Sequence, residues 1–159
     1  MNKITILCPS PLIKDQSIQS IANDYIKRHN AVIEIIDLNV KIKSNDSDVL
    51  VKQKQGEAIL NKIDRLSSSC ALMAMDERGK LLDSRQFSTK LSDYTIQGYS
   101  DLCIIIGGAY GLSSDVLNRV DFKLSFGPMV WPHRLVAIMV LEQLYRAQQI
   151  NAGHPYHKD

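Results

Sequence analysis

The end of the chain concentrates side chains that could do chemistry. The final six positions hold four of them, His154, Tyr156, His157 and Lys158, whereas chain ends ordinarily fray and carry unremarkable residues. Such a tail could close over a site, and a histidine could act there as a base because its pKa lies near neutral pH. Histidines three positions apart could also bind a metal, but no matching cysteine or carboxylate cluster accompanies them, so we expect no metal site. A disordered basic tail is the alternative, since Pro155 prevents simple continuation of a helix.

A glycine-rich turn is the second candidate for chemistry. Gly107 and Gly108 follow an apolar run and precede a Ser-capped helix that we expect to begin near Ser113 or Ser114. Ligands of open α/β sheets bind outside the carboxyl ends of strands, where glycines let a backbone come close. With Gly111, the spacing matches neither the dinucleotide fingerprint nor the phosphate-binding loop, which disfavours a dinucleotide or a nucleoside triphosphate. A purely structural turn is the alternative.

A second loop, Gly127–Pro132, carries the chain's only tryptophan. Its two prolines and one glycine stiffen the backbone, and main-chain amides held in a fixed array can recognise the edge of a flat heterocycle. Met129 and Trp131 could supply apolar walls. Alternatively, the loop is a tight connection from strand to helix, and Trp131 fills the core.

The elements that must position these residues alternate along the chain. Apolar runs typical of strands are separated by stretches with helical periodicity, which predicts an α/β domain with a largely parallel sheet. The expected strands are Lys3–Leu7, Ala31–Asp37, Cys70–Met75, Asp101–Ile106 and Phe122–Phe126. Periodic apolar residues predict helices over Asp15–Arg28 and around Ile59 to Leu66, and the polar, aperiodic segment Val40–Asp48 predicts a loop.

The segment from Pro132 to Ile150 predicts a last helix that is apolar on nearly every face. The outer face of a last helix would meet water in a small domain, so we expect it to pack against a second copy in a homodimer. Glu142 and Arg146 are the polar exceptions; they lie four apart on one face in the favourable acid-before-base order. A surface ion pair is the simplest interpretation of these two.

The composition of the chain limits the classes of function that are possible. The 159 residues, with 45% hydrophobic and 23% charged residues, are typical of one globular domain spanning 1–159. The net charge of +2 gives no sign of DNA binding, so an RNA partner would need clustered basic groups, such as Lys41, Lys43, Lys52 and Lys54. No apolar run is long enough for a membrane span, and we expect a cytoplasmic protein. Three separated cysteines favour reduced core thiols: Cys8, Cys70 and Cys103.

Five motifs occur in order along nearly the whole chain. They are Ile106-Gly-Gly-x-x-Gly-Leu112, Leu124-Ser-Phe126, Met129-x-x-Pro-His133, Glu142-Gln-Leu-Tyr-Arg-Ala147 and His154-Pro-Tyr-His157. Together they resemble the RlmH family, the small SPOUT-superfamily methyltransferases that act on large-subunit ribosomal RNA. The resemblance implies a homodimeric SPOUT-type α/β fold with a C-terminal trefoil knot. It also implies S-adenosyl-L-methionine as methyl donor and, as acceptor, N3 of a pseudouridine in helix 69 of 23S rRNA in the assembled ribosome.

The resemblance also implies a site. The family's cofactor contacts fall on strand end and loop residues that include the glycines above. The expected cofactor-binding residues are Met75, Gly107, Gly108, Gly127, Pro128, Met129, Val130, Trp131 and Pro132. Our hypothesis assigns Arg146 to the developing anion or to phosphate and Glu142 to orienting Arg146, while Tyr156 with His154 or His157 grips the nucleotide. Because the cofactor loop and the tail lie at opposite ends of one helix, we expect each site to be completed by the other subunit.

Two other classes of function stay open at this point. A catalytically silent RNA-binding or ribosome-binding protein of the same fold would not bind S-adenosylmethionine although its glycine loops are intact. A flavodoxin-like small-molecule-binding domain would show flavin absorbance on purification.

Overall fold

The structure is a computed structural model that describes residues 1–12 and 16–156. In this part of the chain strands and helices alternate, as the apolar runs predict. Their order is β1 (Lys3–Cys8), α1 (Gln16–Arg28), β2 (Val32–Asp37), α2 (Asp48–Ile63), β3 (Cys70–Leu81), α3 (Ser84–Ile96), β4 (Asp101–Ile106), α4 (Ser114–Arg119), β5 (Phe122–Ser125) and α5 (His133–Asn151).

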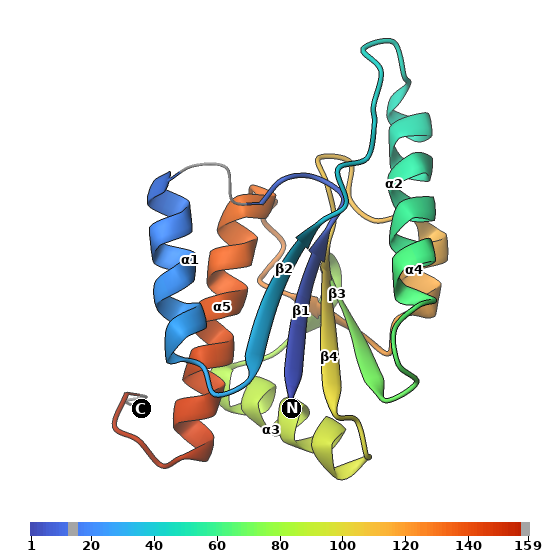
Figure 1. Cartoon of the computed structure of the whole chain (residues 1–159). Helices are drawn as coiled ribbons and strands as arrows, with labels where there is room; N and C mark the ends of the chain where they lie inside the picture. Colours follow the sequence, from blue (N-terminus) through green and yellow to red (C-terminus); the bar gives the residue numbers. More distant parts are fainter. Residues whose placement is uncertain (13–15, 157–159) are drawn as a thin grey trace.

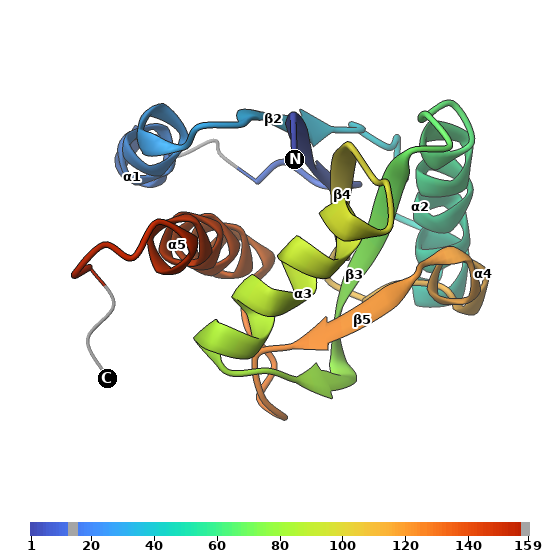
Figure 2. The ribbon, with the colours of Figure 1, turned by 90° about the horizontal axis from the view of Figure 1, so that it is seen from below.

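The strands form one sheet in the order β2-β1-β4-β3-β5, and every paired neighbour is parallel. The expected α/β fold with a largely parallel sheet is therefore confirmed. Because β2, β1 and β4 are parallel neighbours, their carboxyl ends lie at one edge of the sheet, toward the top of Figure 1. Helices cover both faces: Figure 2 shows α1, α3 and α5 on one side and α2 and α4 on the other.

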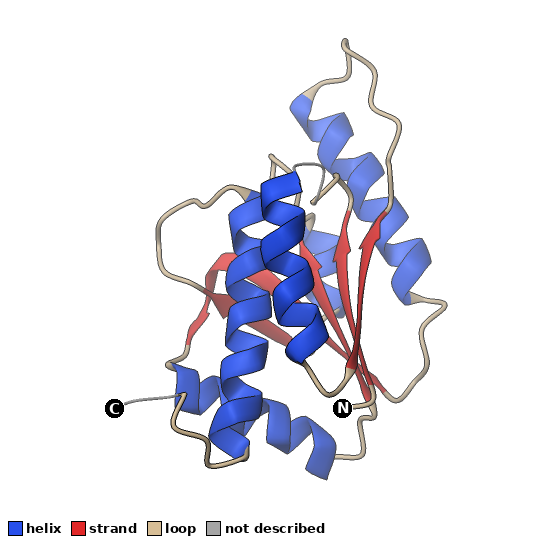
Figure 3. Ribbon diagram, turned by 60° about the vertical axis from the view of Figure 1, so that its left-hand side comes forward, coloured by secondary structure: helices blue, strands red, loops and turns tan. Residues whose placement is uncertain are grey.

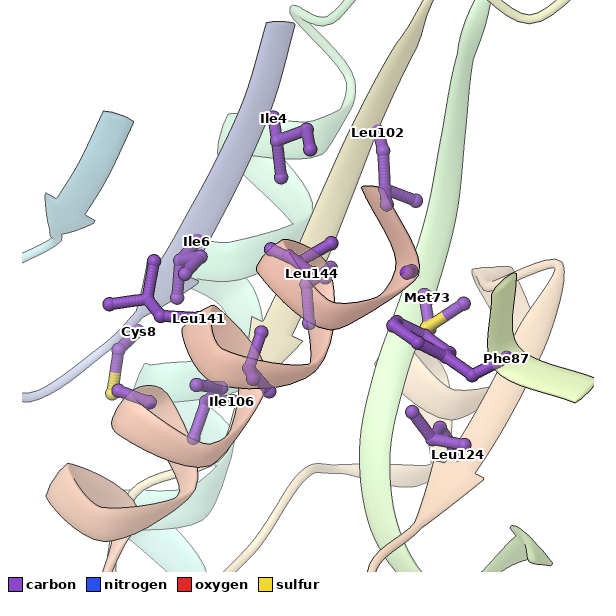
Figure 4. Close-up of a cluster of buried hydrophobic side chains, with 14 of the residues drawn as sticks. Ile4, Ile6, Cys8, Met73, Phe87, Leu102, Ile106, Leu124, Leu141 and Leu144 are labelled. Atoms are coloured by element: carbon purple, nitrogen blue, oxygen red, sulfur yellow. The ribbon is translucent and has the colours of Figure 1, made fainter. Parts of the chain in front are cut away.

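The larger part of the core lies between the sheet and α1, α3 and α5. Alternate strand residues point to this face, among them Ile4 and Ile6 of β1 and Leu102 of β4. They meet Leu141 and Leu144 of α5, as Figure 4 shows. The intervening residues, such as Leu7 and Cys103, pack against α2 and α4 on the other face. Burial on both faces explains why these strands are continuous apolar runs.

Local signals set most element boundaries. The Ser47 side chain caps α2 by accepting from Leu50 N, so the helix begins at Asp48 and the expected loop ends one residue earlier than Val40–Asp48. Asp83 and Gln86 form a capping box at the start of α3. The expected strand Cys70–Met75 is too short: β3 continues to Leu81 through an irregularity between Met75 and Lys80, because it pairs along β5.

The last helix, α5, is only half covered within one chain. It packs against α1 and α3, and Figure 3 shows it beside α1. Five residues on its inner side are buried, namely Ala137, Val140, Leu141, Leu144 and Ala147. The rest of the helix stays at least partly accessible, and Leu135 is 45% exposed. None of the helices in the described ranges 1–12 and 16–156 is long and apolar enough to cross a membrane.

Candidate active site

A cavity of about 730 Å³ opens beside residues 75–78 of β3 and at the carboxyl ends of β4 and β5. The structure brings together eight of the nine residues expected to bind a cofactor. These are Met75, Gly107, Gly108, Gly127, Met129, Val130, Trp131 and Pro132. Parallel strands deliver the segments that follow them to one edge of the sheet, which explains how positions so far apart in the sequence meet. Pro128 is exposed and is not among the residues that line the cavity.

A buried serine links the loop after β5 to Glu77 of β3 by hydrogen bonds. Ser125 is 4% exposed, and its Oγ lies 3.0 Å from the carbonyl oxygens of both Glu77 and Gly127. The same Oγ accepts from Gly127 N at 3.0 Å. Gly127 has φ of +111°, a conformation that side-chain-bearing residues rarely adopt. The loop therefore leaves the strand at a fixed angle and places its next residues along the cavity.

The mouth of the cavity carries exposed apolar side chains. Met129 is 66% exposed, Val130 82% and Trp131 39%. Trp131 therefore does not fill the core, and the purely structural alternative for this loop is wrong for its tryptophan. Tyr110, in the glycine turn, is also exposed. Large apolar groups at the rim of a concave site are suited to contact a flat ligand or a protein surface.

One wall of the cavity is charged, which the sequence analysis missed. Arg78 binds the Asp76 carboxylate in a fork, with Nε 3.0 Å from Oδ1 and Nη2 3.0 Å from Oδ2. The hydrogen bond from Arg78 lowers the pKa of Asp76, so the carboxylate stays ionised. The expected strand ended at Met75, so the apolar pattern did not place Asp76 and Arg78 at the site. The only signal in the sequence was the Asp-x-Arg alternation directly after a buried strand.

A second cluster lies on α5 and the tail. Arg146 reaches Glu142 with Nη2 2.6 Å and Nε 3.0 Å from Oε1, and both side chains are mostly buried. The Tyr156 hydroxyl donates to the same oxygen at 3.3 Å, and the Arg146 guanidinium lies 4.9 Å from the Tyr156 ring centre. Tyr145, a residue the sequence analysis did not single out, packs edge-on against that ring. The predicted pair is thus part of a network and not an isolated surface ion pair.

The network fixes the charges of its members. Hydrogen bonding to Glu142 raises the pKa of Arg146, which stays a cation. Burial, and then the charge of Glu142, raises the pKa of Tyr156, so its phenol stays protonated at neutral pH and does not act as a base. His154 is exposed and accepts from Tyr156 N at 3.2 Å through Nδ1. His157 and Lys158 lie outside the described residues.

The cavity and this network lie apart on the same chain. Pro132 and His133 line the cavity at the start of α5, whereas Arg146 lies thirteen residues beyond His133. At 1.5 Å per helical residue that separation is about 20 Å. One chain therefore does not bring the expected cofactor residues and the expected catalytic residues together.

The cysteines are placed as structural side chains. Cys8 and Cys103 are buried in strands, and burial raises the pKa of each thiol to about 12. Burial raises the pKa of the half-buried Cys70 to about 11. Such thiols are poor nucleophiles at neutral pH. Within residues 1–12 and 16–156, no group of three or more histidine, cysteine, aspartate or glutamate side chains is arranged to hold a metal ion.

A parallel α/β sheet with a cavity at strand ends is the arrangement in which open α/β domains commonly bind small ligands. The chain belongs to the SPOUT methyltransferase family: the family model described as "Predicted SPOUT methyltransferase" matches residues 2–157. The resemblance found in the five sequence motifs is thereby confirmed.

Curated relatives cover the chain almost from end to end. A protein of Clostridium novyi named "Ribosomal RNA large subunit methyltransferase H" is 38% identical over 98% of this chain and 99% of its own length. A protein of the same name from Carboxydothermus hydrogenoformans is 42% identical over 92% of this chain and 94% of its own length. Among solved structures, a probable methylase family protein from Haemophilus influenzae matches with a TM-score of 0.56 at 14% identity, over 99% of this chain and 71% of that one. This last likeness concerns the fold alone.

Proposed function

We propose that this chain uses S-adenosyl-L-methionine to methylate N3 of a pseudouridine in helix 69 of 23S rRNA, in the assembled ribosome. Residues 1–159 form one methyltransferase domain that works as a homodimer in the cytoplasm. The name shared by the relatives supports ribosomal RNA of the large subunit as the substrate. The observation that carries the proposal is the cavity where the strand ends, the glycine turn and the loop Gly127–Pro132 meet.

The residues around this cavity fit S-adenosylmethionine. Its volume of about 730 Å³ lies within the range of sites for small molecules and cofactors, roughly 300–1,000 Å³. Exposed Met129 and Trp131 offer apolar contact to an adenine ring, and the main chain of Gly107 and Gly108, which also line the cavity, offers hydrogen-bonding groups for its polar edge. The ionised Asp76 and its partner Arg78 can face the charged groups of the methionine end. When bound, the cofactor supplies an electrophilic methyl group on a sulfonium.

The network on α5 supplies the groups that handle the acceptor. The nitrogen of a uracil-like base must lose its proton and lie in line with the methyl, and positioning contributes much of the acceleration. Arg146 stabilises the resulting anion or binds a neighbouring phosphate, and Glu142 holds Arg146 in place. Tyr156, together with His154 or His157, grips the nucleotide. A histidine is the base in this scheme, because Tyr156 stays protonated at neutral pH.

A second copy completes each site. The cavity and the α5 network lie about 20 Å apart along one helix, and the outer face of α5 is only half covered in one chain. Packing of two copies through this face lets the tail network of one approach the cavity of the other. A trefoil knot, in which the last helix passes through the loops that form the cavity, belongs to the same proposal.

Transfer of labelled methyl from S-adenosylmethionine tests the proposal. The substrates are assembled ribosomes that lack the modification, isolated large subunits and free 23S rRNA. We expect incorporation into assembled ribosomes only, at N3 of the helix 69 pseudouridine.

Each other outcome revises a defined part of this assignment. Incorporation at another nucleotide, or into free RNA as readily as into ribosomes, would overturn the acceptor. If the protein binds the cofactor but modifies none of these substrates, the acceptor is also wrong. If it does not bind the cofactor, the chain is a silent RNA-binding or ribosome-binding protein of this fold.

A further inference from the structure

Gln55, from α2, occupies the crevice between β1 and β4 at their carboxyl ends. These strands are neighbours, yet the helices that follow them, α1 and α4, cover opposite faces of the sheet. Such a reversal opens the crevice in which open α/β sheets bind ligands. Gln55 Nε2 donates to Ser10 Oγ, just after β1, at 3.4 Å. The same side-chain amide meets Gly108, just after β4.

The contact with Gly108 leaves no room for a side chain at that position. A Cβ on Gly108 would lie 2.6 Å from Gln55 Oε1 and 2.9 Å from Nε2. Real carbon atoms do not approach so closely, so the amide of Gln55 packs directly on the main chain of the glycine turn. Gly108 also lines the cavity, whereas Gln55 is not among the residues that do. Gln55 therefore supports the cavity from behind its wall.

The Gln55 carbonyl oxygen is buried without a partner. Gln55 is 6% exposed, and its Oε1 is one of two buried side-chain polar atoms in the described part of the chain that lack a hydrogen bond. A buried acceptor without a donor lowers stability, and an apolar side chain of similar length would avoid that loss. Packing alone therefore does not explain a glutamine at this position, because its unpaired oxygen lowers stability.

We propose that Gln55 is a positioning residue of the cofactor cavity, whose Oε1 accepts a hydrogen bond from the main chain of residues 107–111 when the cavity is filled. This bond fixes Gly108 against the ligand. The proposal rests on the proposed function, because the ligand it names is S-adenosylmethionine. Within the glycine turn, Gly111 N donates to the Gly108 carbonyl at 3.0 Å. A bond from the main chain of the turn to Gln55 Oε1 would hold Gly108 against α2.

Two substitutions separate positioning from packing, because neither is expected to lower stability and affinity together. Gln55→Met keeps the length and removes the acceptor; we expect unfolding by urea at the same or a higher concentration, with S-adenosylmethionine binding at least fivefold weaker by calorimetry. Gln55→Glu keeps an acceptor oxygen but buries a carboxyl group; we expect easier unfolding, with affinity within twofold of the parent protein. Gln53→Met, an exposed position on the same helix, is the matched control and changes neither quantity.

Hydrogen exchange gives a readout that does not depend on activity. In the parent protein, S-adenosylmethionine should slow exchange of the amides of residues 107–111, and in Gln55→Met this protection should be lost. If affinity follows stability across the variants, or if Gln55→Met binds as tightly as the parent, Gln55 is core packing and the inference is wrong. If the parent protein itself does not bind S-adenosylmethionine, the proposed function fails and the role of Gln55 fails with it.

Discussion

Tyr156 connects the tail to α5 through three contacts. Its hydroxyl donates to Glu142, its ring lies against the Arg146 guanidinium, and Tyr145 packs on its edge. These contacts leave Arg146 held from two sides, by a carboxylate and by an aromatic face. In the proposed mechanism, an arginine fixed in this way is already oriented toward an anion before the substrate binds, which is how preorganised charge accelerates a reaction.

Substitution Tyr156→Ala should abolish methyl transfer and spare cofactor binding. Removal of the ring and hydroxyl frees Arg146 and Glu142, so we expect the rate of transfer to ribosomes to fall by about 100-fold or more. The affinity for S-adenosylmethionine, measured by calorimetry, should stay unchanged because Tyr156 is not among the residues that line the cavity. Loss of both properties together would instead assign the tail a structural role.

Residue types alone predict part of this site. The loop Gly127–Pro132 stands out because glycine and proline cluster after an apolar run, and the tail stands out because functional side chains gather there. Asp76 and Arg78 escape notice because the β3 run is interrupted after Met75 and resumes only through the pairing with β5. The contact between Tyr156 and Glu142 depends on how the chain turns back after α5. The spacing of residues in the sequence does not predict that turn.

At the scale of elements, the sequence predicts strands better than helices. The strands are apolar runs buried on both faces, and Asp101–Ile106 is confirmed at both ends. Helix α3 was not singled out because its buried residues are few, namely Phe87, Ser88 and Tyr94, and one of them is polar. Ser88 is nevertheless essential to the packing: its Oγ bonds to the Ala147 carbonyl and to Asn151, which ties α3 to the end of α5.

Histidine 29 makes the junction of α1 and α5 sensitive to pH. Burial lowers the pKa of His29 below its usual 6.5, and its Nδ1 accepts from Ala31 N at 3.0 Å, which requires the neutral ring. The unfolded chain therefore binds more protons between the two pKa values, and the free energy of unfolding falls as the pH drops through about 6.5. Urea unfolding between pH 5 and 8 should show a steeper loss in the parent protein than in His29→Gln. Parallel curves would contradict this assignment.

The segment between β2 and α2 projects beyond the sheet as an arm (Figure 1). Lys41 and Lys43 are exposed on it, whereas Lys54 is paired with Asp46 at 2.6 Å and Lys52 lines the cavity. Lys41 and Lys43 are therefore the two exposed members of the predicted lysine cluster. The arm lies at the end of the sheet where the strands' carboxyl ends also lie.

Replacement of both arm lysines, Lys41→Ala with Lys43→Ala, should weaken ribosome binding and leave cofactor affinity unchanged. Each phosphate contact contributes about one to the slope of log affinity against log salt, so we expect the slope to fall by about two. Binding measured at several salt concentrations checks this expectation. An unchanged slope would remove the arm from the RNA interface.

At the scale of the whole molecule, charge and geometry both favour recognition of the proposed RNA substrate by its shape and not by bulk electrostatic attraction. Two copies carry a formal charge of only +4, twice +2, so bulk attraction to RNA is weak. The cavity and the α5 network are about 20 Å apart on one chain, and the half-covered outer face of α5 is the natural contact for a second copy. We propose that each working site takes its cavity from one copy and its tail network from the other.

Mixed dimers test that claim most directly. Trp131→Ala impairs the cavity and Arg146→Ala impairs the network, so each variant alone should be inactive. When the two are coexpressed in equal amounts, half of the dimers are mixed, and each mixed dimer holds one intact site of two. Methyl transfer should then return to about a quarter of the parent activity. If the mixture stays as inactive as the separate variants although mixed dimers form, each chain carries a complete site and the account is contradicted.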